Sequence, residues 1–385
     1  MVENIQPAEI AELCSRLIQL KTVNPPGDEL PAAQLVLDFL KPVGFEGELL
    51  SQGMGRATAM ARLHGSGDRP AVVFNGHLDV VPVGAQPWRY DPFAGEIAGG
   101  KVWGRGAADM KGGLAALLVA AKVVAQSRLP LQGDLLVTAT AGEEVDMLGA
   151  TTIIALPDLH PWQVIIIAEP TSNQLGLSER GVLWIEFTTI GKTAHGSTPE
   201  LGHNAVMMMV ALLSELDRLQ IPFRPHPVLG SFSRSINTIQ GGVMVNVVPD
   251  HCTATVDLRT VPGQDHTRLI EQLQTFLDSL EKRIPDFRAS LRIVTDLPAV
   301  ETPSDAPPVQ LFADAVQEVI HHPVEEQVVR FATEASIFVP ALKVPAIIFG
   351  PGDAALAHQP DEFIEVEKMV QAAQIYALAA IKMLQ

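Results

Sequence analysis

Three residues in one short stretch carry side chains that bind divalent metal ions. His77 and Asp79 follow an apolar run, residues 71–74, which we expect to be a buried strand. Because they are two positions apart in extended backbone, their side chains point to the same side. Asp109 follows in a glycine-rich turn that leads into a helix rich in Ala and Leu. An imidazole with two carboxylates suits a divalent metal, although a loop histidine and a helix N-cap aspartate would explain the same residues.

Other apolar, strand-like runs of the chain also end at acidic residues or lead to a histidine. The residues that follow these runs are Glu143, Glu144, Glu169 and His358. In open parallel sheets, ligands bind beyond the carboxyl ends of the strands. We therefore expect these side chains to converge with His77 and Asp109 on one rim of a sheet.

Two metal ions bridged by one carboxylate would use most of these side chains. In this arrangement His77 and Glu169 bind one ion, Glu144 and His358 bind the other, and Asp109 lies between the two. The alternative is that acidic and imidazole side chains lie at the ends of strands without a shared task. Consecutive strand ends rarely carry so many of them, so we favour the metal centre.

Two candidate residues remain outside these ligand sets. Glu143 is the neighbour of Glu144 in a loop at the end of a strand, so it should point another way and be free to act as a base toward water. Asp79 lies two positions from a ligand histidine, which suits a residue that orients the imidazole of His77.

The elements that must position these residues are of the α/β type. Apolar strands alternate with helices in residues 1–179, which predicts a mostly parallel sheet covered by helices. The same pattern returns in residues 296–385, where we expect a strand at 327–330 among other elements. These two segments together form the first predicted domain, which carries the candidate catalytic residues.

Residues 180–295 follow a different pattern. Runs such as 182–190, 235–248 and 252–259 alternate between apolar and polar residues with a period of two, which indicates half-exposed strands. Helical segments separate several of these strands. Antiparallel strands with helices on one face predict an inserted α+β domain.

The composition excludes some classes of protein. The 385 residues include 44 acidic and 27 basic side chains, and the net charge of −17 disfavours nucleic acid and anionic membranes as partners. No apolar run is long enough to span a bilayer, and the N-terminal segment lacks the pattern of a signal peptide. The two cysteines, Cys14 and Cys252, lie in apolar settings and are expected to be core thiols. We expect a cytoplasmic protein.

Over nearly the whole chain, the sequence resembles the di-zinc metallopeptidase family that contains acetylornithine deacetylase, succinyl-diaminopimelate desuccinylase, aminoacylase and carboxypeptidase G. The resemblance rests on motifs that occur in the family's order. These motifs are GHLDVVP (76–82), GRGAADMKGG (104–113), AGEEVDMLGA (141–150), AEPT (168–171), GKTAHGSTPELGHNA (191–205), GGVMVNVVPD (241–250), DLR (257–259) and GPGDAALAHQPDEF (350–363).

The resemblance implies a centre with two Zn²⁺ ions per subunit, for which Co²⁺ can substitute. The residues that match the family's metal ligands are His77, Asp109, Glu144, Glu169 and His358. Glu143 matches the general base of the family, and Asp79 matches the residue that orients the neighbouring histidine. These assignments agree with the arrangement inferred from the residues themselves.

The resemblance also implies that the insert is a lid or dimerisation domain and that the protein is a homodimer. His195 looks like the residue that reaches the partner subunit's site and steadies the oxyanion, whereas a turn or capping histidine is the alternative. Asn246 and Arg259 match residues that contact the substrate in relatives. For Arg259 the alternative is a surface ion pair with Asp257 or another acid.

The implied activity is metal-dependent removal of an acetyl or succinyl group from the nitrogen of a small N-acyl amino acid. Subfamily motifs conflict, because GRGAADMKG resembles the desuccinylase whereas residues 330–363 resemble the end of acetylornithine deacetylase. A dipeptidase or carboxypeptidase of the same family is the alternative with the same chemistry. A non-catalytic metal-dependent binding protein is a third, although no ligand or base of the family is lost here.

Overall fold

The apolar runs that predicted buried strands form the central sheet of the first of two structural units. The computed structural model describes residues 2–157, 159–322 and 324–385. Contacts divide the chain into unit 1 (Met1–Leu177, Glu301–Val329 and Thr333–Gln385) and unit 2 (Ser178–Val300 and Arg330–Ala332). The chain leaves unit 1 and re-enters it at adjacent points, since the backbone N–H of Thr302 donates to the carbonyl oxygen of Leu177 (2.8 Å).

Unit 1 is built on a six-stranded sheet in the order β1-β2-β6-β3-β7-β14. Its strands are β1 (Glu46–Ser51), β2 (Ala57–Leu63), β3 (Arg69–His77), β6 (Gly133–Thr140), β7 (Trp162–Ile167) and β14 (Ala346–Ile348). β6, β3, β7 and β14 run parallel to one another. β2 pairs antiparallel with β6, and β1 pairs antiparallel with β2. The prediction of a mostly parallel sheet is therefore confirmed.

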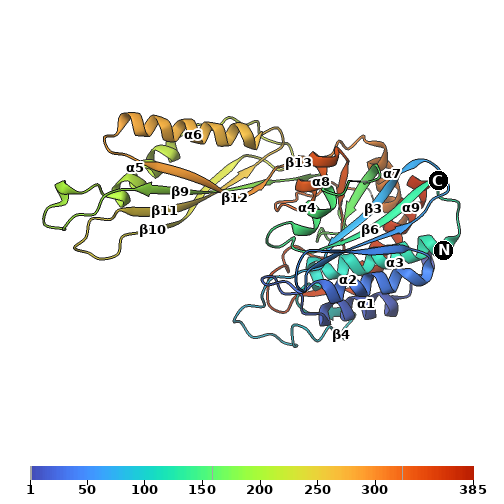
Figure 1. Ribbon diagram of the computed structural model, residues 1–385. Helices are drawn as coiled ribbons and strands as arrows, with labels where there is room; N and C mark the ends of the chain where they lie inside the picture. Colours follow the sequence, from blue (N-terminus) through green and yellow to red (C-terminus); the bar gives the residue numbers. More distant parts are fainter. Residues whose placement is uncertain (1, 158, 323) are drawn as a thin grey trace. The chain divides into compact units, whose positions relative to one another are not determined.

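Helices cover the sheet of unit 1 (Figure 1). They are α1 (Pro7–Gln19), α2 (Leu30–Leu40), α3 (Gly112–Ser127), α4 (Leu148–Ile154), α7 (Pro307–Ile320), α8 (Ala335–Leu342) and α9 (Val366–Leu384), with the single turns η1 (Val2–Asn4), η2 (Lys41–Val43) and η3 (Ala107–Lys111). α3 is buried almost all round and packs against α1, α9 and β3. Each of its buried leucines contributes about 1.5–3 kcal/mol through burial alone, so this helix anchors the turn η3 that precedes it.

Two features of unit 1 differ from the sequence prediction. A small sheet of β4 (Glu96–Ala98), β5 (Lys101–Trp103) and β15 (Phe363–Glu365) was not predicted. The predicted strand at 327–330 is wrong, because these described residues form no strand and the pairing near them consists of isolated bridges such as that between Glu326 and Leu175. The residue after Leu175, Gly176, pairs with Ile348 of β14 instead.

Unit 2 is a four-stranded antiparallel sheet in the order β10-β11-β9-β12, with two helices on one face (Figure 1). Its elements are β9 (Gly181–Ile190), β10 (Ser233–Gly241), β11 (His251–Thr260), β12 (Ala289–Leu297), α5 (Ala205–Arg218), α6 (His266–Arg283) and the turn η4 (Pro199–Leu201); β8 (Ser178–Glu179) and β13 (Val300–Glu301) form a separate two-stranded sheet. Alternate residues of β9 and β11 are buried in the core with α5 and α6, as the period of two predicts. The predicted inserted α+β domain is confirmed.

One strand of unit 2 is shorter than predicted. The sequence placed a strand over 235–248, but β10 ends at Gly241. Gly242 has a φ of 82°, in the left-handed region that favours glycine, and turns the chain away from the sheet. The residues that follow, Val243 to Val245, are exposed.

Among the described residues, no helix combines the length and the apolar character that are needed to cross a bilayer.

Candidate metal centre

The candidate ligands of unit 1 gather beyond the carboxyl ends of neighbouring parallel strands, as the sequence predicts. His77 is the last residue of β3, Glu144 follows β6, and Glu169 follows β7. Asp109 lies in the turn η3 before α3, and His358 lies in the loop between β14 and β15. The parallel order of β6, β3 and β7 brings the first three together because parallel strands end at the same edge.

Three of these side chains form a first triad. The Nε2 atom of His77 lies 3.1 Å from Oδ1 of Asp109 and 3.8 Å from Oε1 of Glu169. The side chains of His77 and Glu169 are almost fully buried, with 1% and 4% of their surface exposed. An imidazole and two carboxylates at this spacing are a set that could hold one divalent cation.

A second triad shares Asp109 with the first. The Nε2 atom of His358 lies 3.4 Å from Oδ2 of Asp109 and 3.2 Å from Oε2 of Glu144. Asp109 therefore turns one oxygen toward each histidine, which is the geometry of a carboxylate that bridges two metal ions. His358 is half exposed, so the second triad is the one open to solvent.

Glu143 lies beside the first triad without belonging to either. Its Oε2 atom is 3.9 Å from Nε2 of His77, and the side chain is largely buried. A carboxylate next to a cation site but outside the ligand set is free to accept a proton from water.

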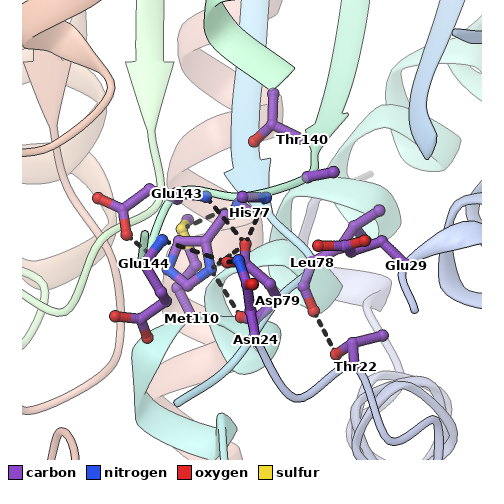
Figure 2. A network of polar contacts seen from close by, with 12 residues as sticks. Thr22, Asn24, Glu29, His77, Leu78, Asp79, Met110, Thr140, Glu143 and Glu144 are labelled. Atoms are coloured by element: carbon purple, nitrogen blue, oxygen red, sulfur yellow. Dashed lines mark hydrogen bonds and ion pairs between the residues drawn. The ribbon is translucent and has the colours of Figure 1, made fainter. Parts of the chain in front are cut away.

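Asp79 is buried below the ligands and holds the loop that carries Glu143 and Glu144 (Figure 2). Its carboxylate accepts hydrogen bonds from the backbone N–H groups of Gly142 (3.0 Å), Glu143 (3.0 Å) and Glu144 (3.2 Å), and from the side-chain amide of Asn24 (2.9 Å). Charge-assisted bonds of this kind are stronger than neutral ones, so the loop has little freedom to move.

The imidazole of His77 is oriented by the backbone of Asp79 more directly than by its carboxylate. Nδ1 of His77 donates to the carbonyl oxygen of Asp79 at 2.9 Å, whereas the nearer carboxylate oxygen is 3.7 Å away. With the proton on Nδ1, a neutral ring presents its lone pair at Nε2, the atom that faces Asp109. The tautomer that a metal ligand needs is thus fixed from behind.

Two glycines make the ligand loops possible. Gly142 has a φ of 82°, and a Cβ atom there would lie 2.3 Å from the carboxylate of Asp146. Gly106, at the start of the turn that carries Asp109, has a φ of 85°. Since residues other than glycine rarely adopt this backbone conformation, both loops depend on glycine at these positions.

The pKa values of these groups show how strongly the charges interact. Burial opposes the protonation of His77, but its hydrogen bond to Asp109 and the nearby carboxylates outweigh that effect and raise its pKa well above the usual value. Hydrogen bonds to Asp109 and Glu144 raise the pKa of His358 to about 10. Burial raises the pKa of Glu143 well above its usual value.

The donor set fits two divalent cations. When ionised, the carboxylates of Asp109, Glu143, Glu144 and Glu169 carry four formal negative charges in one largely buried cluster. Two divalent cations would balance this charge, and nitrogen and oxygen ligands suit Zn²⁺ and similar metals. Buried charge of one sign needs such a partner, because unpaired charges are costly to bury.

Sequence reasoning assigned no role to a buried ion pair next to this centre. Arg105 and Glu362 lie 2.6 Å apart with 2% and 1% of their side chains exposed. Both fall inside motifs that also carry a candidate ligand, GRGAADMKGG and GPGDAALAHQPDEF. The available signal was a charged residue inside a motif rich in glycine or apolar residues, because a charged side chain that is buried there needs a partner of opposite charge.

A further buried acid, Glu334, ties together two strands that carry the site. It accepts hydrogen bonds from the side-chain amide of Asn75 in β3 (2.6 Å) and from the hydroxyl of Thr140 in β6 (2.7 Å). Burial raises its pKa. Asn75 and Thr140 are close to the ends of their strands, so Glu334 fixes the spacing of the edge at which the ligands gather.

His195 and Asn246 lie side by side in unit 2. The loops that carry them are joined because Gly196 donates its N–H to the carbonyl oxygen of Asn246 (2.8 Å), and both side chains are exposed. Nδ1 of His195 accepts from the backbone N–H of Ser197 (3.2 Å). The proton of a neutral ring is therefore on Nε2, which is free to donate outward.

Arg259 lies at the other end of the same sheet. Its Nε atom is 2.9 Å from the carboxylate of Asp257, which is the ion pair weighed as an alternative from the sequence. Along β11, Arg259 is separated from His251, which pairs with the end of β9, by about 26 Å at 3.3 Å per residue. The structure thus places His195 with Asn246 but does not bring Arg259 to them.

Two histidine–carboxylate triads at one edge of a parallel sheet fit a metal-dependent enzyme of the metallopeptidase class. The model of the family "Peptidase family M20/M25/M40" matches residues 73–382, so the chain belongs to this family and hydrolyses amide bonds. The family identified from the sequence motifs is confirmed.

The chain is similar over most of its length to two bacterial proteins and to one solved structure. The chain is 28% identical to a probable succinyl-diaminopimelate desuccinylase of Staphylococcus epidermidis over 94% of this chain and 95% of the relative. It is 31% identical to the acetylornithine deacetylase of Myxococcus xanthus over 88% of each chain. Its fold matches the crystal structure of an M20 family metallo-carboxypeptidase of Sulfolobus solfataricus with a TM-score of 0.79, 19% identity and coverage of 98% and 100% of the two chains.

Proposed function

We propose that this protein removes an acetyl or succinyl group from the nitrogen of a small amino acid, with two divalent cations, Zn²⁺ or Co²⁺, bound in unit 1. The observation that carries the proposal is the pair of triads that share Asp109, with Glu143 beside them and outside both. His77 and Glu169 would complete one site. A binding protein would need the ligands but not a free base in this position.

When bound, the cations supply Lewis acidity, which polarises the amide carbonyl and lowers the pKa of water. Glu143 accepts the proton that water loses as its oxygen forms a bond to the carbonyl carbon. When the C–N bond breaks, Glu143 returns that proton to the leaving nitrogen, so its own charge is unchanged over the cycle. Asp79 keeps Glu143 in place through the backbone of its loop.

The two named relatives favour acyl amino acids as substrates over peptides. A desuccinylase and a deacetylase both cleave an amide between a short acyl group and an amino acid, and both are similar to this chain over most of its length. The identities to the two relatives, 28% and 31%, are similar, so the proposal names both acyl groups.

We further propose that unit 2 is the lid and dimerisation domain and that each site is completed by His195 of the partner subunit. Its outward Nε2 proton suits a donor to the oxyanion. Large apolar side chains are exposed on unit 2, and they include Met207, Val210, Ile239, Val243, Met244 and Val245. Exposed apolar side chains in such number favour a surface that a second copy covers.

The substrate is tested by a panel of N-acetyl and N-succinyl amino acids set against dipeptides and folyl-glutamates, with the enzyme reconstituted in Zn²⁺, Co²⁺ or Mn²⁺. We expect turnover of at least one acyl amino acid to exceed that of every dipeptide. Preferential cleavage of dipeptides would overturn the acyl assignment and leave the metal centre intact.

The two-cation centre is tested by titrating metal-free protein with Zn²⁺. We expect two binding events, with the tighter one lost in His77→Ala and in Glu169→Gln and spared in His358→Ala. A single stoichiometric metal that His358→Ala does not affect would refute the arrangement of two sites.

A further inference from the structure

The loop that carries Asp109 is held by one carboxylate from a distant part of the chain. Glu362 accepts hydrogen bonds from the backbone N–H groups of Gly106 (3.0 Å), Ala108 (2.8 Å) and Asp109 (3.1 Å). Its backbone carbonyl oxygen accepts a fourth, from the N–H of Gly104 (2.9 Å). Glu362 is thus hydrogen-bonded to the backbone of Asp109, the residue whose side chain is shared by the two triads.

Glu362 also belongs to the segment that carries His358. Only three residues separate them in the sequence, and directly after Glu362 the chain enters β15, which pairs with β5 through Phe363 and Trp103. The bridging ligand and the histidine of the second triad are therefore connected through a single side chain. A shift of Glu362 would change the distance between Asp109 and His358.

Arg105 balances the charge of Glu362 and extends the same contact network. One guanidinium nitrogen, Nη1, bonds the carboxylate of Glu362 (2.6 Å) and the carbonyl oxygen of Gln359 (3.3 Å). The other, Nη2, donates to the carbonyl oxygen of Pro82, in the loop that follows His77 and Asp79 (3.4 Å). Three loops that carry or follow candidate ligands thus meet at one buried guanidinium.

We propose that Glu362, supported by Arg105, is a positioning residue that sets the spacing between Asp109 and His358 and so the affinity of the second cation site. The inference rests on the proposed two-cation centre. It does not require Glu362 to touch a cation or the substrate. Because His358 belongs only to the second triad, we expect that site to be affected more than the first.

The most direct test is Glu362→Gln, which keeps the size of the side chain but removes its charge and replaces one acceptor by a donor. That donor would face backbone N–H groups, which are also donors. Residues that support metal ligands typically change affinity by 10–100-fold when replaced. In Co²⁺ titrations of the metal-free protein, followed by calorimetry and by cobalt absorption, we expect the weaker step to lose about this factor.

Two further readouts separate positioning from a general loss of stability. High Co²⁺ should restore turnover in Glu362→Gln, because the deficit is in affinity. The amides of Gly106, Ala108 and Asp109 should exchange hydrogen faster in the variant than in the wild type. Arg105→Lys keeps the charge but loses the forked contacts, so the same step should weaken by a smaller factor.

Asp134→Asn is the matched control. Asp134 is another acid of unit 1 that pairs with an arginine, Arg62, at 3.5 Å, and its carboxylate also accepts a hydrogen bond from a backbone N–H, that of Gly65 (2.9 Å). It is partly buried at the start of β6, at the end of the strand away from Glu144. We expect this variant to keep both Co²⁺ steps even where its midpoint of thermal unfolding falls. If Asp134→Asn weakens the second step as much as Glu362→Gln does, the effect is not positional and the proposal fails.

The outcomes distinguish this inference from the proposed function. Glu362→Gln with both Co²⁺ steps within twofold of the wild type would overturn the positioning role and leave the two-cation centre standing. Wild-type protein that binds fewer than two cations would overturn the centre itself. If Glu362→Gln does not fold, Arg105→Lys decides: a second step within twofold of the wild type in that variant overturns the proposal.

Discussion

The two units hold their candidate functional side chains in opposite ways. In unit 1 the ligand loops are tied from behind by buried carboxylates, Asp79 for one loop and Glu362 for the other. In unit 2, His195 and Asn246 are exposed and are fixed mainly by backbone contacts between two loops. The first arrangement is complete within its unit, whereas the second offers donors toward solvent.

This difference fits the roles proposed for the two groups. Side chains that concentrate negative charge need a rigid frame, because a small displacement changes the interaction with a cation steeply. A donor that meets a substrate only when a partner arrives can stand on an exposed loop. Substitutions in one unit that leave the other unchanged can therefore separate the proposed role of the metal centre from that of His195.

The largest effect is expected at the proposed base in unit 1. Glu143→Gln removes the proton acceptor but keeps the side-chain shape, so turnover should fall about 10²–10⁴-fold while both metal ions stay bound. Steady-state rates and elemental analysis of the same preparation measure the two quantities. Glu318→Gln is the control, since Glu318 is an exposed acid of α7 paired with Lys382. This variant should change neither the turnover nor the metal content.

A second outcome for Glu143→Gln would change the assignment. If this variant loses metal, Glu143 is a ligand, and its role and that of Glu144 have been exchanged. Glu144 would then be the free base, and Glu143 would be the ligand in the second triad.

A smaller but still large effect is expected from unit 2. His195→Ala removes the proposed donor to the oxyanion and should lower turnover about 10²–10³-fold without changing metal content. If the donor comes from the partner, mixing His195→Ala subunits with Glu143→Gln subunits should restore about a quarter of wild-type activity. Half of the randomly formed dimers then contain one intact site.

Mass spectrometry of the intact dimers must show that subunits exchange in this mixture. Mixed dimers without activity would refute the contribution in trans. A strictly monomeric protein with full activity would remove the need for a partner.

Substitutions in the core of unit 1 and on the surface of unit 2 should differ in their effect on the free energy of unfolding. Leu117 is buried on α3, so Leu117→Ala should lower the free energy of unfolding of the metal-free protein by about 2–5 kcal/mol. Val245 is fully exposed, so Val245→Ala should change it by no more than about 0.5 kcal/mol in dilute protein. Denaturant titrations compare the two. A large loss for Val245→Ala would show that this segment is covered in solution.

The smallest effect is expected at the cysteines. Burial raises the pKa of the Cys14 thiol to about 12. Because only the thiolate reacts and Cys14 is fully buried, iodoacetamide should label it far more slowly at pH 8 than it labels an exposed thiol. Peptide mapping should find Cys14 unlabelled in native protein and labelled in denaturant. Rapid native labelling at pH 8 would contradict the buried setting.

The sequence predicts where the candidate ligands at strand ends lie because these positions depend on a local pattern. A strand buried on both faces must be apolar throughout, so the ends of β3 and β7 can be recognised from their runs, and the residues just beyond them are the candidates. The same rule predicts α3, whose small and apolar residues allow burial all round.

Contacts made through the backbone could not be predicted in this way. Asp79 and Glu362 act on N–H groups of distant segments, and an N–H group is present whatever the residue type. β15 is found only because Phe363 lies against Trp103, far away in the sequence. The strand predicted at 327–330 failed for the same reason, since a strand requires a neighbour as well as a suitable composition.

The hydrogen bond between Thr302 and Leu177 has a consequence for the history of this architecture. It joins the points at which the chain departs from unit 1 and returns to it. An insertion whose ends are adjacent leaves the route of the surrounding sheet unchanged, whatever its length or sequence. The segment between these ends can therefore diverge, shorten or be exchanged for another while the five proposed ligands, all in unit 1, keep their frame. A change in this segment would therefore alter the proposed donor His195 while the proposed metal ligands stay in place.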